Sequence, residues 1–221
     1  MGAVLNRRRG GAQYIPRPAT WSLGGIAAPA VHPLRRAVAD VVAAVEGSAG
    51  ERPLAPAFPD SRLSAVLVAL ADGDDGAEVL LTLRSMDLRH HRGEISFPGG
   101  RVDPGETPVA AALREAHEEV GLDPASVTVV GELDHLNTAV SLSYIVPVVA
   151  RLAEPVPLRP TSPEVERIFW LPLAELVRPD TYRAERWGVP PTDRLIHFFE
   201  LDDETIWGAT ATMLVDLLRR L

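Results

Sequence analysis

The sequence predicts an α/β fold in which a mixed β-sheet lies between helices. Apolar runs of strand length are bounded by turn-forming residues, as in 63–71 and 77–84. Other segments repeat apolar residues at helical spacing, as in 32–47. Strands and helices occur together without strict alternation, which favours a mixed sheet. With 221 residues and 46% hydrophobic content, the chain is long enough to bury one large core.

The first part of the chain is expected to be an extension. Residues 1 to about 31 are rich in Gly, Arg and Pro and are predicted to form a flexible or loosely docked lead-in. A helix is predicted over 32–47, ending at Gly47. Five apolar residues share one stripe of it: Leu34, Val38, Val41, Val42 and Val45. A Pro-rich linker follows at 51–60. We therefore expect an extension over residues 1–55 and one domain over residues 56–221.

The runs 63–71 and 77–84 are predicted to be a strand pair, since "DGDDG" between them is a turn signal. This turn has the composition of a calcium loop. It lacks the remaining ligands and the terminal Glu of such a loop, so a plain exposed turn is predicted.

The next helix has clear boundary signals. Thr107 can cap its start and Pro108 fits the first helical position, while Gly121 can end it. Further apolar runs predict strands at 126–132, 143–150, 166–171 and 195–201. A last helix is predicted over 208–220.

Composition excludes several classes of function. The net charge of −8 argues against non-specific binding to nucleic acid or to an anionic membrane. The absence of Cys excludes disulfides, zinc–thiolate sites and a cysteine nucleophile. All 22 basic residues are Arg, which excludes Schiff-base chemistry and a phosphate-binding loop ending in Lys-Ser/Thr.

The basic N-terminus is not followed by an apolar stretch of secretory length, so no signal peptide is predicted. No window of about 18 apolar residues predicts a membrane span. A cytoplasmic location is therefore expected.

The helix over 107–121 carries an unusual set of charges. Glu115, Glu118 and Glu119 stand at i, i+3 and i+4, so they share one face. Carboxylates at this spacing repel one another. A hard divalent cation would offset the repulsion, and Mg²⁺ prefers oxygen ligands of this kind.

The segment 99–122 resembles the Nudix box, G-x5-E-x7-R-E-U-x-E-E-x-G-U, where U is a bulky aliphatic residue. Eight residues match in register: Gly100, Glu106, Arg114, Glu115, Glu118, Glu119, Gly121 and Leu122. Ala116 departs from the pattern, since Ile, Leu or Val is usual there, and we expect looser packing beneath the helix.

The resemblance implies an α/β/α sandwich with a mixed β-sheet, in which the box forms a loop–helix–loop. It implies that Mg²⁺ or Mn²⁺ is held by Glu115, Glu118, Glu119 and a backbone carbonyl of the loop at Gly99. It also implies that Glu106 pairs with Arg114 and orients the helix and loop. The activity implied is metal-dependent cleavage of a nucleoside diphosphate linked to another moiety. The expected partner is a small-molecule nucleotide, and a homodimer is an allowed assembly.

The segment 80–100 is similar to a second signature, LLTxR[SA]x3Rx3Gx3FPGG, of the coenzyme A pyrophosphatase branch of this family. The matching residues are Leu80, Leu81, Thr82, Arg84, Ser85, Arg89, Gly93, Phe97, Pro98, Gly99 and Gly100. Segments 162–176 and 206–214 also resemble this branch. The substrate implied is coenzyme A or a derivative, giving 3′,5′-ADP and 4′-phosphopantetheine.

Arginine clamps phosphate through paired planar donors, and coenzyme A carries a diphosphate and a 3′-phosphate. Arg84, Arg89 and Arg92 are therefore candidates for substrate binding, and His91 and His90 are candidate donors. The alternative for each is a structural role in the loop.

The sequence allows alternatives for the substrate, for a catalytic role and for the general base. "AVSLSY" (139–144) departs from the branch, which leaves room for ADP-ribose, a dinucleotide or a nucleoside triphosphate. A non-catalytic sensor or scaffold would also retain the fold, although it need not keep mutually repelling carboxylates. The general base is either Glu115 or one of Glu164 and Glu166, and the alternative for the last two is an exposed loop charge.

Overall fold

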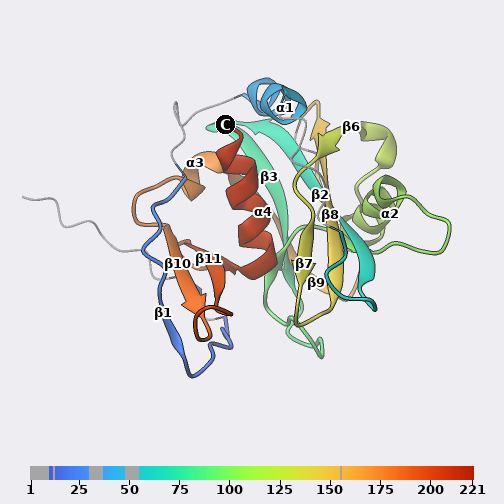
Figure 1. The fold of residues 1–221 in the computed structure, drawn as a ribbon. Coiled ribbons are helices and arrows are strands. Elements are labelled where there is room, and N and C mark those ends of the chain that lie inside the picture. Colours follow the sequence, from blue (N-terminus) through green and yellow to red (C-terminus); the bar gives the residue numbers. More distant parts are fainter. Residues whose placement is uncertain (1–9, 12, 30–36, 48–54, 155) are drawn as a thin grey trace, which may run out of the picture.

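An eight-stranded mixed sheet lies at the centre of the computed structural model (Figure 1). Its main path has the order β4-β3-β2-β8-β6, while β5 pairs with β2, β7 with β8 and β9 with β3. The pair β2–β8 is parallel and the other pairs are antiparallel. The strands are β2 (Arg62–Gly73), β3 (Gly76–Arg84), β4 (Ile95–Ser96), β5 (Gly99–Arg101), β6 (Val127–Glu132), β7 (Leu136–Thr138), β8 (Ser143–Leu152) and β9 (Val165–Pro172).

Helices cover both faces of this sheet (Figure 1). α2 (Pro108–Val120) packs on one face, and α1 (Val38–Gly47) and α4 (Gly208–Arg219) pack on the other. Strand β2 serves both cores, because alternate side chains of a strand point to opposite faces. Leu67 and Ala69 belong to the core beneath α2, whereas Val68 and Leu70 belong to the core beneath α1 and α4. The prediction of an α/β/α sandwich with a mixed sheet is confirmed.

A second, four-stranded sheet lies beside α4, in the order β1-β10-β11-β12. Its strands are β1 (Trp21–Leu23), β10 (Tyr182–Trp187), β11 (Arg194–Glu200) and β12 (Thr205–Trp207). The sequence predicted only the strand at 195–201. β10 reads "YRAERW" and β1 only "WSL", so neither has an apolar run that would identify it as a strand.

The structure describes residues 10, 11, 13–29, 37–47, 55–154 and 156–221. The predictions for residues 1–9, for Leu34 and for the start of the linker lie outside the described residues. The described part of the lead-in is docked on the second sheet, through the pairing of β1 with β10 and through a hydrogen bond from Arg17 to Glu185. Asp74 and Asp75 form the exposed turn between β2 and β3.

Most other predicted elements agree with the structure to within one or two residues. Besides β1, β10 and β12, the sequence did not predict the short strands β4, β5 and β7, the 3₁₀ helix η1 (Pro124–Ser126) or α3 (Leu173–Leu176). No helix among the described residues is both long and apolar enough to cross a membrane.

Candidate active site

α2 has the boundaries that its sequence predicts. The Thr107 hydroxyl accepts a hydrogen bond from the backbone N–H of Ala110 at 3.2 Å, and Gly121 ends the helix in the left-handed region at φ 71°. Three alanines on the inner face of α2, Ala111, Ala112 and Ala116, are fully buried against the sheet. Because these side chains are small, the rest of the helix, with its carboxylates, lies close to the sheet and the loop before it.

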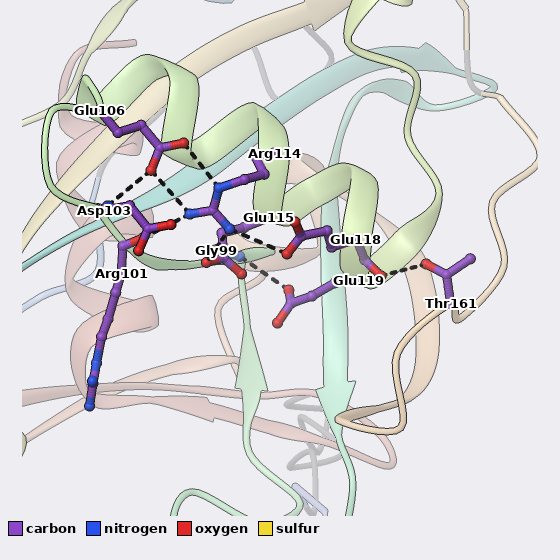
Figure 2. A network of polar contacts seen from close by, with 9 residues as sticks. All are labelled: Gly99, Arg101, Asp103, Glu106, Arg114, Glu115, Glu118, Glu119 and Thr161. Carbon is purple, nitrogen blue, oxygen red and sulfur yellow. Dashed lines mark hydrogen bonds and ion pairs between the residues drawn. The ribbon is translucent and has the colours of Figure 1, made fainter.

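The loop that precedes α2 is attached to the sheet through β5, which pairs with β2. The backbone N–H of Gly99 donates to Oε2 of Glu119 at 3.1 Å (Figure 2). A Cβ at Gly99 would lie 2.4 Å from the carbonyl oxygen of Ala65. A Cβ at Gly100 would lie 2.5 Å from the carboxyl carbon of Glu115. The two glycines therefore let the loop backbone approach both β2 and the carboxylates.

Arg114 stands at the centre of the polar network (Figure 2). Its Nε and Nη2 donate to the two carboxylate oxygens of Glu106, at 3.0 and 3.1 Å. Nη1 donates to Glu115 at 2.9 Å and to Glu118 at 3.2 Å. Nη2 also donates to the carbonyl oxygen of Arg101 at 3.0 Å. One guanidinium thus joins α2 to both ends of the loop before it.

The glutamate side chains of the site differ in burial and in pKa. Burial raises the pKa of Glu119 to about 7, with the nearby Glu115 and Glu164 acting in the same direction and the Gly99 hydrogen bond and Arg84 opposing it. The hydrogen bond from Arg114 lowers the pKa of Glu106. Glu118 is more than half exposed. The three carboxylates of one helix face therefore occupy a buried, a partly buried and an exposed position.

The donor set fits a hard divalent cation in its chemistry. Three carboxylates and the Gly99 carbonyl offer only oxygen ligands, which suit Mg²⁺ or Mn²⁺. The carboxylates do not converge, since Glu119 accepts from Gly99 whereas Glu115 and Glu118 are paired with Arg114. Within the part of the chain that the structure describes, no three His, Asp or Glu side chains are already arranged around a metal position.

The candidate substrate-binding residues do not form one group. Arg84, at the end of β3, donates through Nη2 to Glu164 at 3.0 Å. His91 has a positive φ of 56°, and its Nδ1 bonds to Glu94 at 2.9 Å, which raises the pKa of His91. Arg89, His90 and Arg92 are exposed on the same loop. Of this set, only Arg84 contributes to the electrostatics of Glu119.

Sequence reasoning did not identify Thr161. Its hydroxyl donates to the carbonyl oxygen of Glu118 at 2.8 Å, and its backbone N–H donates to that of Glu119 at 3.0 Å (Figure 2). A threonine in the segment "RPTSPE", about 40 residues after the helix, gives no signal of this contact. Glu166, the other candidate base, is exposed on β9.

Comparison with known proteins gives a family match. The family model described as NUDIX domain matches residues 61–192. NudL of Photorhabdus laumondii, described as an uncharacterized Nudix hydrolase, is 37% identical over 144 residues, which cover 64% of this chain and 76% of that protein. Nudix hydrolase 22, chloroplastic, of Arabidopsis thaliana is 36% identical over 170 residues, covering 73% of this chain and 56% of that protein.

The chain spans about half the length of several curated relatives that it matches, among them Nudix hydrolase 3 of Caenorhabditis elegans at 48%. Among solved structures, a Nudix hydrolase from M. smegmatis, RenU, is 29% identical with a TM-score of 0.46, over 52% of this chain and 73% of that one.

Proposed function

Because the chain belongs to the NUDIX domain family, we propose that it hydrolyses the diphosphate bond of coenzyme A or its derivatives, giving 3′,5′-ADP and 4′-phosphopantetheine. The observation that carries this proposal is the continuity of two signatures, one over 80–100 and one over 99–122. The contact between Gly99 and Glu119 supports it, since it joins the end of the first signature to the carboxylate helix of the second.

Nudix hydrolases generally use divalent cations such as Mg²⁺ or Mn²⁺, which stabilise the negative charge that develops on the diphosphate as it is cleaved. We propose that Glu115, Glu118, Glu119 and the carbonyl of Gly99 hold the cation in this chain. Through their ion pair, Arg114 and Glu106 would hold α2 and the loop before it in a fixed relative position. Glu115 is the proposed general base within the box.

The arginine-rich loop is the proposed recognition element. Arg84, Arg89 and Arg92, with His91, would bind the phosphates, because guanidinium groups match phosphate oxygens with paired donors. The exposure of Arg89, His91 and Arg92 supports this proposal, since their donors are accessible to a ligand.

A substrate panel with Mg²⁺ and with Mn²⁺ tests the proposal. Coenzyme A, 3′-dephospho-coenzyme A, ADP-ribose, NADH and a dinucleotide are compared by kcat/KM, with each product identified. We expect coenzyme A to be preferred and 3′,5′-ADP to be formed. A tenfold preference for ADP-ribose or NADH would overturn the coenzyme A assignment.

A second candidate is a Nudix pyrophosphatase acting on another nucleoside diphosphate derivative. The turn within "AVSLSY" favours this second candidate, because its sequence departs from the pattern of the coenzyme A branch. There Leu142 has a positive φ of 49° and Val140 is 89% exposed. A ligand that reaches this turn would meet an apolar, irregular surface. The same panel separates the two candidates.

We also propose a cytoplasmic location and a small-molecule nucleotide as the only class of partner needed for activity. A homodimer remains an allowed assembly. The division into an extension over residues 1–55 and a domain over residues 56–221 is likewise a proposal.

A further inference from the structure

Residues 161–165 connect the carboxylate helix to the end of β3, and we call them the bridging segment. At one end, Thr161 donates two hydrogen bonds to the carbonyl oxygens of Glu118 and Glu119. At the other end, the backbone N–H of Ser85 donates to the carbonyl oxygen of Glu164 at 2.8 Å. The segment therefore contacts both the candidate metal ligands and the first arginine of the recognition loop.

Glu164 is fixed within this segment by short-range contacts. Its backbone N–H donates to the Ser162 hydroxyl at 3.2 Å, and the N–H of Val165 donates to the Ser162 carbonyl at 3.2 Å. Such side-chain and backbone turns restrict the local chain. The Glu164 carboxylate, half exposed, then accepts from Nη2 of Arg84 at 3.0 Å.

Arg84 has hydrogen-bonding capacity that the protein leaves unused. Its Nε is buried and has no acceptor among the described residues, although buried donors are normally paired. The Arg84 side chain is still 22% exposed, and its guanidinium has N–H donors besides Nε and the Nη2 donor that contacts Glu164.

The pair also lies near the catalytic carboxylates. Arg84 and Glu164 are both within electrostatic range of Glu119, where the arginine favours the charged carboxylate and Glu164 opposes it. An anionic substrate bound beside Glu119 would therefore meet the Arg84 cation.

We infer that Glu164 is a positioning residue that holds the Arg84 guanidinium in the orientation from which it binds the diphosphate of the substrate. The inference rests on the proposed function, because it assumes that a diphosphate is the group bound. Arginine has several rotatable bonds, so fixing it before the substrate arrives lowers the entropy cost of binding. Glu164 then acts through Arg84 and does not itself transfer a proton.

Two variants of Glu164 distinguish this role from that of a general base. Glu164→Gln keeps an oxygen that can accept from Arg84, whereas Glu164→Ala removes it. We expect Ala to raise KM for coenzyme A roughly fivefold, as suits a partly exposed ion pair, with kcat within about twofold of wild type. Glu164→Gln should leave KM close to the wild-type value. Glu46→Gln, an exposed glutamate on α1, is the matched control and should change neither constant.

A general base would behave differently. Both variants would then lower kcat alike, by roughly a hundredfold, and the acid limb of the kcat profile against pH would disappear. That result would overturn the inference. Unchanged kinetics in both variants would overturn it too, since Glu164 would then be an exposed charge without a role.

A double-mutant cycle with Arg84→Ala measures the dependence on Arg84 directly. We expect Glu164→Ala to have no further effect on KM once Arg84 is removed. A full, independent effect in the Arg84→Ala background would contradict the inference.

The same cycle is measured on binding of α,β-methylene-ADP, a non-hydrolysable diphosphate, with Ca²⁺ present. Coupling between Arg84 and Glu164 in the Kd supports the inference even if wild-type protein does not hydrolyse coenzyme A. Failure of the proposed function is thereby separated from failure of the inference. Binding without coupling would overturn the inference while leaving the function in place.

Discussion

At the scale of single residues, the position of α2 depends on a few side chains that have more than one partner. Arg114 is the clearest case, because it binds Glu106 through two parallel hydrogen bonds and also contacts Glu115, Glu118 and the Arg101 carbonyl. Bidentate carboxylate binding requires the planar fork of arginine. The same residue therefore fixes the loop and partly neutralises the carboxylates that would bind a cation.

Arg114→Ala is expected to lower stability as well as activity. Glu106 loses its ion-pair partner, and Glu115 and Glu118 lose the guanidinium that contacts both of them. We expect Tm to fall by a few degrees, the shift that a network of partly exposed contacts gives in a chain of this size. Arg114→Lys keeps the charge without the fork and should recover part of the loss. Differential scanning calorimetry at pH 7 checks this, and an unchanged Tm in Arg114→Ala would refute the proposed pairing.

Glu119→Gln is expected to reduce kcat by roughly 10²–10³ while the protein stays folded, as loss of a group that stabilises charge in the transition state does. The amide oxygen can still accept from the Gly99 N–H, so the fold should persist. Mn²⁺ binding, followed by electron paramagnetic resonance, should weaken in parallel. More than a tenth of the wild-type rate at saturating Mg²⁺ would exclude Glu119 as a ligand.

Arg89→Ala is expected to raise KM for coenzyme A by roughly ten- to a hundredfold, the range for a charge-assisted hydrogen bond. Arg89 is exposed, so Tm should not change. Arg89→Lys should restore only part of the affinity. The measurement is kcat/KM for coenzyme A against ADP-ribose. Equal losses on the two substrates would assign Arg89 to loop structure and not to recognition of coenzyme A.

At the scale of elements, α2 is held at both ends by contacts outside its own hydrogen-bond ladder. Thr107 caps the first turn, and Gly121 takes the left-handed conformation that ends the last one. Beside Gly121 lies Thr161, whose Cγ2 would be 3.5 Å from an added Cβ. The C-terminal turn carries Glu118 and Glu119, so its geometry affects the candidate metal ligands directly.

Gly121→Ala is expected to destabilise the protein by about 1 kcal/mol, because an L-residue with a Cβ is strained at positive φ. In a chain of this length Tm should fall by roughly 2–4 °C. Gly47→Ala at the end of α1 is the control, since its Cβ would meet open space and no positive φ is required there. Equal Tm values for the two variants would show that the left-handed cap is not important for stability.

At the scale of the whole molecule, the described part of the N-terminal segment is joined to residues far along the chain. β1 pairs with β10, and Arg17 binds Glu185, which is 1% exposed. Burial alone would raise the pKa of Glu185, but hydrogen bonds from Arg17 and Trp187 and the charge of Arg183 outweigh it and lower the pKa. A buried carboxylate with these partners makes the second sheet depend on the segment that precedes α1.

Arg17→Ala should therefore lower Tm, and the size of the loss should depend on pH. The pKa of Glu185 is below its ordinary value of 4.5 in the folded protein, so its stabilising contribution is present above pH 4.5 and is lost as pH falls through the folded pKa. The Tm difference between variant and wild type should be largest near neutral pH and should shrink in acid.

Arg194→Ala, which removes an exposed arginine of β11, is the control and should show no such dependence. A difference between Arg17→Ala and wild type that stays constant from pH 7 to pH 4 would contradict the role given to Glu185.

The sequence by itself determined the five longer strands of the central sheet, the helices α2 and α4, the described part of α1 and the carboxylate face of α2. These features depend on local periodicity and on end signals such as Thr107 and Gly121, which are readable within a few residues. Two glycines before the helix and the pairing of Glu106 with Arg114 were also readable, because the spacing of a known motif contains them.

Only the tertiary structure decided which distant residues meet this helix. β1 and β10 have too few apolar residues to be recognised. β10 is a strand because it pairs with β11 on one edge and β1 on the other, and β1 is a strand because β10 supplies its hydrogen-bonding edge. Thr161 and Glu164 reach the site only because β9 pairs with β3 and brings the bridging segment beside Arg84. Long-range pairing of this kind leaves no local pattern in the sequence, since each partner satisfies polar groups that the other segment alone would expose to water.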